Sequence, residues 1–243
     1  MKLLVGLLLS LSGISGLAAP IVTDSQGRSM DVEVIAYNQS SGNLKIKRSD
    51  GQQFNVKIGM FDVASQQLIA ENAPKLKADL DIKVSVGKRR SRQGDSSYMK
   101  DQTISASVAV ENESRDIDFP EGNGTLLLIA RQTKRYSEDG ADYGKVLSKQ
   151  KFNIAAKSGE ATSVEAKPIV TSYDSDRDST NVGGWEYYGY AFILVDADGE
   201  IYTVETSIGN LKKDVEENPV IGKELLALGE GSLVEKNLAT RKQ

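Results

Sequence analysis

The chain has 243 residues and a formal net charge of −4, and it contains neither cysteine nor histidine. These absences exclude disulfide bonds, the Ser-His and Cys-His nucleophile systems and the usual metal-ligand sets. The mildly acidic net charge does not indicate the basic surface that binds nucleic acid. We therefore expect a non-enzymatic protein with no catalytic residues, no metal site and no cofactor, stabilised by packed cores and strand pairing.

The first residues are typical of an export signal. Lys2 precedes an apolar run that extends to Leu17, and the small residues Ala18 and Ala19 follow. This order predicts a signal peptide over residues 1–18 and a protein that is periplasmic, secreted or bound at the cell surface. An uncleaved N-terminal anchor is the alternative. No later run reaches the roughly 18 apolar residues that cross a bilayer, so we expect no membrane span after cleavage.

Short alternating runs fill residues 20–74. Apolar and polar residues alternate over residues 31–37, 44–48 and 54–58, with turn residues at Gly42-Asn43 and Asp50-Gly51. A sheet of such short strands must curl to bury its apolar face, so the pattern predicts a small β-barrel. Asp62 is placed to cap a following helix that Pro74 would end.

These residues resemble a known family. The segments that carry the likeness are Thr23–Arg28, Val32–Val34, Gly42–Gly51 and Phe54–Val56, followed by a helix with Gln66 and Leu68-Ile69. They resemble the Sla homology domain one, which in fungal endocytic adaptors is a Src-homology-3-like barrel that recognises short peptide motifs. Many exported bacterial proteins carry a similar module. The likeness covers about a fifth of the chain and implies the SH3-like barrel fold; no binding residue is carried over from the family.

Longer alternating runs follow over residues 78–212. Seven strands are expected at residues 80–86, 103–112, 125–133, 146–154, 161–170, 185–195 and 201–208. Seven short strands with turn-rich gaps are typical of an immunoglobulin-like β-sandwich. The sequence therefore predicts an all-β chain, a small barrel followed by a sandwich.

Residues 213–243 form a predicted helical tail. Asn218-Pro219 is a typical helix start. Apolar residues then repeat at helical spacing, namely Ile221, Leu225 and Leu228. Ser232 and Glu235 have capping-box spacing for a second short helix. The apolar stripe predicts that the tail packs on the sandwich or, alternatively, that it docks on another chain and supports self-association.

A dense cationic run lies between two expected strands. It consists of Lys88, Arg89, Arg90 and Arg92. We expect a loop there that could bind an acidic partner, an anionic glycan or a lipid headgroup. A solvated loop balanced by Asp95 and Asp101 is the alternative.

Aromatic residues concentrate in the expected strand at 185–195. Strict alternation places Trp185 and Tyr187 on one face, and Tyr188 and Tyr190 on the other. Both faces would then be apolar, as in a central strand covered on both sides. The alternative is a sugar-stacking or partner-binding platform, for which Trp185, Tyr188 and Tyr190 are the candidate residues.

One acidic segment resembles the start of a calcium loop. Asp174 and Asp176 alternate as calcium ligands do, but Ser179 stands where an EF-hand needs glycine and Trp185 where it needs glutamate. This excludes an EF-hand and leaves a solvated loop or a looser surface calcium site.

The combined features predict an exported protein-interaction module. Its partner would be an envelope or surface protein, for instance within a pilus-like or envelope assembly. Two alternatives remain open: a glycan-binding adhesin that uses the aromatic strand, and a carboxylate-only hydrolase, which would need two acids facing each other in a cleft.

Overall fold

The computed structural model describes residues 21–39, 41–73, 76–133, 143–176 and 181–234; the expected signal peptide lies outside them. The chain divides into two compact units, residues 1–76 and 77–243. Strands dominate both units, and the predicted all-β class is confirmed. Within the described ranges, no helix is long and apolar enough to cross a membrane.

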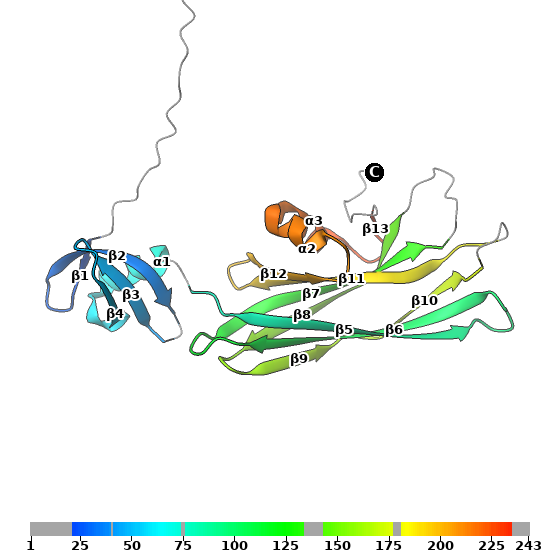
Figure 1. The fold of residues 1–243 in the computed structure, drawn as a ribbon, viewed down its shortest axis with the longest axis horizontal. Coiled ribbons are helices and arrows are strands. Elements are labelled where there is room, and N and C mark those ends of the chain that lie inside the picture. The colour runs from blue at the N-terminus through cyan, green and yellow to red at the C-terminus, as the bar shows by residue number, and fades with distance from the viewer. Residues whose placement is uncertain (1–20, 40, 74–75, 134–142, 177–180, 235–243) are drawn as a thin grey trace, which may run out of the picture. The chain divides into compact units, whose positions relative to one another are not determined.

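The first unit is an antiparallel meander with the strand order β1-β2-β3-β4 (Figure 1). Its strands are β1 (Ile21–Thr23), β2 (Ser29–Asn38), β3 (Asn43–Arg48) and β4 (Gln53–Lys57). A short 3-10 helix, η1 (Ile58–Met60), leads back to the first strand. There Asp24 forms a β-bridge with Phe61, and the Asp62 N–H donates to the Thr23 carbonyl at 2.9 Å. These contacts join the two ends of the meander and close it into a small barrel.

Helix α1 (Val63–Asn72) completes this unit. The Asp62 carboxylate accepts a hydrogen bond from the Ser65 N–H at 2.8 Å, so the expected N-cap is confirmed. Ile69 is buried from the helix side. The core of the unit consists of Val22, Val32, Tyr37, Leu44, Ile46, Phe61 and Ile69.

The second unit is a sandwich of two antiparallel sheets (Figure 1). One sheet contains β5 (Leu80–Arg92), β6 (Met99–Asn112), β9 (Ala161–Glu165) and β10 (Ile169–Asp174). The other contains β7 (Phe119–Gln132), β8 (Gly144–Ala156), β11 (Trp185–Asp196), β12 (Ile201–Thr206) and β13 (Leu233–Val234), in the order β12-β11-β7-β8-β13. This division of successive strands between two sheets is that of an immunoglobulin-like sandwich.

One expected strand is in fact two. The run predicted at residues 161–170 is interrupted between β9 and β10, which pair with successive stretches of β6. Pro168 lies in the interruption and has no N–H to donate to a ladder. The Ala166 N–H still donates to the Ala106 carbonyl, so the segment stays beside β6.

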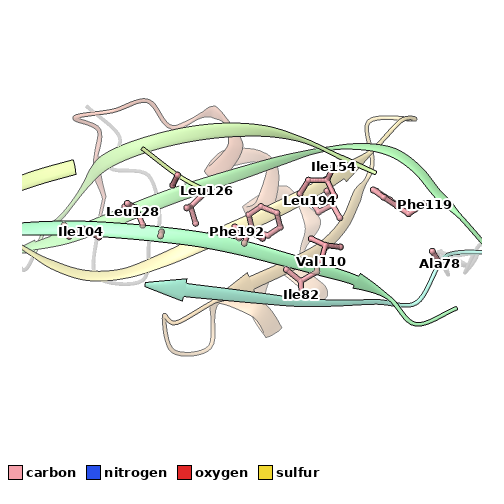
Figure 2. Packing of buried hydrophobic residues seen from close by; sticks show 13 residues of the cluster. Ala78, Ile82, Ile104, Val110, Phe119, Leu126, Leu128, Ile154, Phe192 and Leu194 are labelled. Atoms are coloured by element: carbon pink, nitrogen blue, oxygen red, sulfur yellow. The ribbon is translucent and has the colours of Figure 1, made fainter. Parts of the chain in front are cut away.

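The main core lies between the two sheets. Ile82, Ile104 and Val110 on one sheet face Leu126, Leu128 and Phe192 on the other (Figure 2). Phe192 is completely buried. Since side chains alternate along each strand, this layer uses one side of β7 and β11 and leaves their other side to be covered separately.

Two helices cover that other side (Figure 1). They are α2 (Leu211–Glu217) and α3 (Pro219–Ala227), so the helical segment begins before the predicted boundary at residue 213. Asn218 is the N-cap of α3, as predicted, and accepts a hydrogen bond from the Val220 N–H. Apolar tail residues pack with the outer face of β7 and β11, namely Leu211, Val215, Leu225 and Leu228 against Leu127, Ile129, Ala191 and Ile193. The alternative in which the tail packs on its own sandwich is therefore the one observed.

The end of the tail differs from the prediction. Leu233 and Val234 form strand β13, which pairs with Lys145 and Gly144. The second helix expected from Ser232 is therefore wrong over the described residues, and its remainder from Glu235 lies outside them. Capping-box spacing is a local signal, and here pairing with an open strand edge overrides it.

Candidate functional site

A groove of about 410 Å³ opens on the barrel. It is lined by Asp24, Ser25, Gln26, Arg28, Met30, Ile46, Arg48, Phe54, Val56, Met60 and Phe61. Ile46 and Phe61 are buried core residues, whereas Phe54 is 39% and Met60 55% exposed. The volume is that of a small-ligand or single-side-chain site, and its apolar surface is open to a partner.

The loop between β1 and β2 forms one wall of this groove. The Asp24 carboxylate accepts hydrogen bonds from the N–H groups of Gln26 at 2.9 Å and Arg28 at 2.8 Å. Gly27 has φ +80°, a conformation that glycine adopts without strain. The Ser25 N–H donates to the Met60 carbonyl at 2.9 Å, which ties the loop to η1. Hydrogen bonds within the chain therefore hold this wall of the groove in place.

The polar rim of the groove includes two arginines, Arg28 and Arg48, and each is paired with a carboxylate of the same chain. Arg28 donates through Nε to the Asp24 carboxylate at 2.6 Å, and its side chain is 73% exposed. The Arg28 N–H bond and the other donors hold the pKa of Asp24 below its ordinary value, so this carboxylate stays ionised. Arg48 has its guanidinium carbon 6.0 Å from the Phe54 ring centre. A ligand carboxylate at the rim would share these arginines with Asp24 and Asp50, while the floor accepts an apolar side chain.

Sequence reasoning did not identify this groove. Phe54 and Val56 alternate correctly in β4, but the barrel is too small to cover Phe54. The groove also joins residues from the two ends of the barrel sequence, Asp24 and Phe61, which only the closed sheet brings together. The sequence signal for such a groove would have been an apolar strand face, here that of β4, for which no further segment supplies a covering layer.

The cationic run lies on a strand and not in the expected loop. Lys88, Arg89, Arg90 and Arg92 form the second half of β5 and pair with β6. The prediction failed because long charged side chains at a sheet edge can extend a strand beyond its apolar residues. The expected balancing acids do not pair with the run. Arg90 instead donates to Glu186 of β11 at 2.6 Å.

A bulge redistributes the aromatic residues of β11. The pairing with β7 shifts between Tyr187 and Gly189, so Tyr188 is an extra residue. As a result Tyr187 and Tyr190 pack with the inter-sheet core, whereas Tyr188 packs on the helix-covered side. The strict alternation predicted for this strand therefore holds from Tyr190 onward and is wrong for Tyr187 and Tyr188.

The aromatic rings are already engaged by cations of the same chain. The Lys145 Nζ lies 5.5 Å from the Trp185 ring centre, and the Arg131 guanidinium lies 3.3 Å from that of Tyr188. Lys88 lies 5.5 Å from the Tyr187 ring centre. Burial raises the pKa of Tyr187 to about 12, and it also raises the pKa of Tyr190. A stacking sugar would have to displace these cations.

The acidic segment that resembles a calcium loop is bound to its own backbone. The buried carboxylate of Asp174 accepts hydrogen bonds from the N–H groups of Asp176 at 2.9 Å and Val182 at 2.8 Å. Ser179 lies outside the described residues. Among the residues that the structure describes, no group of His, Cys, Asp or Glu side chains is placed to hold a metal ion.

Comparison with known proteins gives no family assignment: neither a family model nor a curated protein matches the chain. Among solved structures, the chain is similar to part of Bacteroides uniformis β-glucuronidase 2, with 15% identity and a TM-score of 0.27 over 51% of this chain and 12% of that one. A Kluyveromyces marxianus β-glucosidase has 15% identity and a TM-score of 0.24, over 53% of this chain and 14% of that one. A protein from Akkermansia muciniphila has 12% identity and a TM-score of 0.19, over 57% and 78%. Similarities this low carry no argument about function.

Proposed function

We propose that this chain is an exported, non-enzymatic protein-interaction module whose barrel groove binds a short extended segment of an envelope or cell-surface protein. The observation that carries the proposal is the exposure of Phe54 and Met60 in a groove of about 410 Å³. Exposed apolar surface of this kind marks interaction sites. The hydrogen-bonded loop at Asp24 keeps the groove formed without a ligand, which lowers the entropy cost of binding.

The lining residues define the chemistry of the expected segment. An apolar side chain would fill the space beside Phe54 and Met60, and a neighbouring carboxylate would lie near Arg28 or Arg48. Charged rim groups steer encounter and fix orientation, while the apolar anchor provides most of the affinity.

The same residues favour this function over the two alternatives. The groove contains a single carboxylate, Asp24, and its lowered pKa makes it a poor proton donor near neutral pH. A carboxylate-only hydrolase needs a pair of acids. The adhesin alternative relies on Trp185 and Tyr188, over whose rings Lys145 and Arg131 already lie.

The proposed location, in the periplasm or at the cell surface, follows from the signal-like residues 1–18. Membership of a pilus-like or envelope assembly is the setting in which a non-enzymatic module of this kind would act. Charged substitutions at Leu7, Leu8 and Leu9 should leave the precursor in the cytoplasm, which cell fractionation measures. Normal export of that variant would contradict the assignment.

The groove can be tested with displayed peptides. Peptides selected from a random library on the full chain should contain an apolar residue near an acidic one, and Phe54→Ala should weaken their binding by about tenfold or more, as measured by fluorescence anisotropy. Val63→Ala is the matched control, because Val63 is 75% exposed but does not line the groove. Equal binding to wild type and Phe54→Ala would refute the proposal.

A further inference from the structure

The sandwich has an open sheet edge that is separate from the barrel groove. β5 pairs with β6 along its length, from Leu80 with Asn112 to Arg92 with Lys100. In the order β10-β6-β5 it is the terminal strand, and no described strand pairs with its other side. Alternate N–H and C=O groups on that side therefore have no ladder partner.

The two halves of this edge differ in what lies near them. Beside the start of β5, the Tyr202 hydroxyl of β12 donates to the Ala78 carbonyl, and the Lys77 Nζ lies 5.4 Å from the Tyr202 ring centre. In the second half, the inter-strand contacts are made by inward-reaching side chains, Lys88 to Tyr187 and Arg90 to Glu186. Among the described residues, no backbone hydrogen bond joins residues 87–92 to a strand other than β6.

The second half of β5 also carries unneutralised positive charge. Within the described residues, Lys88, Arg89 and Arg92 take part in no ion pair, and all three are exposed. Their cross-strand neighbours on β6 are Ile104, Thr103 and Lys100, none of which is acidic. Only Arg90 is paired, with Glu186. The open edge is therefore strongly cationic.

We propose that the second half of β5, residues 87–92, binds an extended acidic peptide segment by strand addition. Backbone hydrogen bonds would provide affinity, and side chains at alternate positions would provide selectivity. Acidic residues of the added strand would lie opposite Arg89 and Arg92, where opposite charges stabilise a cross-strand pair. A second copy of β5 centred on the same residues would place cations against cations, which disfavours self-pairing.

The strand-addition mode can be tested on the wild-type full chain with three synthetic peptides. The first, called the Glu-Val peptide, repeats Glu-Val-Val, which places Glu residues three positions apart so that they can lie opposite both Arg89 and Arg92. The second repeats Lys-Val-Val, and the third is the Glu-Val peptide with every backbone amide N-methylated. We expect the first peptide to bind with a salt-dependent affinity, and the other two to bind at least about tenfold more weakly. Hydrogen exchange should slow at residues 87–92. Equal binding of the methylated peptide would overturn the proposal, because it keeps the charge but cannot pair.

A charge-matched pair of variants locates the site. Arg89→Glu with Arg92→Glu should weaken the Glu-Val peptide by about tenfold or more. Lys151→Glu with Lys157→Glu makes the same charge change at exposed positions in β8 and directly after it, and should leave binding unchanged. Phe54→Ala should also leave it unchanged, which separates this edge from the barrel groove.

Three results would overturn the proposal in favour of another occupant. They are tighter binding of a heparin fragment than of the peptide, binding of phosphatidylglycerol vesicles but not of the peptide, and dimerisation that the Arg89→Glu, Arg92→Glu variant abolishes. Unchanged peptide binding by a folded Arg89→Glu, Arg92→Glu variant would overturn it as well.

Discussion

The sandwich covers its apolar strand faces on both sides, whereas the barrel leaves part of its apolar surface exposed. In the sandwich, β7 and β11 are apolar on both sides, and α2 and α3 cover the side that the second sheet does not. In the barrel, α1 contributes Ile69 to the core but Phe54 and Met60 remain open. Since this chain covers apolar faces elsewhere with helices, the uncovered face of the barrel is informative, and it supports a binding role.

Removal of α2 and α3 should change stability and self-association most, because it exposes the apolar face that these helices cover. Deletion of residues 211–243 removes the buried side chains of Leu211, Val215, Leu225, Leu228 and Val234, each of which contributes about 1.5–3 kcal/mol by burial. The exposed face of β7 and β11 should then cause self-association, which sedimentation velocity measures. The full-length chain should be monomeric under the same conditions. A truncated chain that stays monomeric and equally stable would show that the helices are not a cover.

The same substitution in each unit tests the contrast at single residues. Phe192→Ala should lower the free energy of unfolding of the sandwich by about 3–5 kcal/mol, because it leaves a cavity between the sheets. Phe54→Ala in the barrel should have little effect on unfolding, since Phe54 is 39% exposed. Urea titration of both variants measures the difference. Similar losses for the two would mean that Phe54 belongs to a core.

A buried amide should give a smaller loss, confined to the sandwich. The Asn112 amide nitrogen donates to the carbonyls of Ile117 at 2.8 Å and Ala156 at 3.0 Å, and its oxygen accepts from the Ser114 N–H at 3.1 Å. Asn112→Ala leaves these groups unpaired and should cost about 2–3 kcal/mol, read from the sandwich transition in a urea titration. Asn123→Ala, at an exposed position of β7, is the control and should be near neutral.

The smallest effect concerns the pH dependence of the barrel. The pKa of Asp24 is lowered in the folded state, chiefly by the Arg28 N–H bond, so its contribution to stability is complete above the unfolded pKa and is lost as pH falls through the folded value. The barrel transition should therefore weaken below about pH 4. Asp24→Asn should flatten this slope in thermal melts between pH 5 and pH 3. If the dependence of the melting temperature on pH is unchanged in Asp24→Asn, groups other than Asp24 cause the acid sensitivity of the barrel.

Local signals in the sequence predicted much of the fold. Alternation in β3 and β6, the Asp62 cap of α1 and the Asn218-Pro219 start of α3 all depend on residues within one turn or one strand. Such features need no knowledge of distant neighbours, which is why they were predicted.

The candidate sites depended on distant residues and were predicted less well. The groove requires the closure of Asp24 onto Phe61, and the cationic run becomes a strand because β6 extends beside it. The exposure of Phe54 was not foreseen, because alternation gives the face of a residue but not what covers that face. The cations and the aromatic strand were chosen separately, and the structure brings Lys88 to Tyr187 and Arg90 to Glu186.

The bulge in β11 has a consequence for engineering and for insertion or deletion during evolution. A Cβ atom at Gly189 would lie 2.7 Å from the Ser207 hydroxyl oxygen and 2.8 Å from a side-chain carbon of Ile208, so this site admits only glycine without displacement of a neighbour. Loss of Tyr188 would make the pairing with β7 regular and would leave Tyr187 opposite Ala130, on the side that faces Lys88. The bulge therefore absorbs one inserted residue, and the first part of β11 still faces the cationic strand.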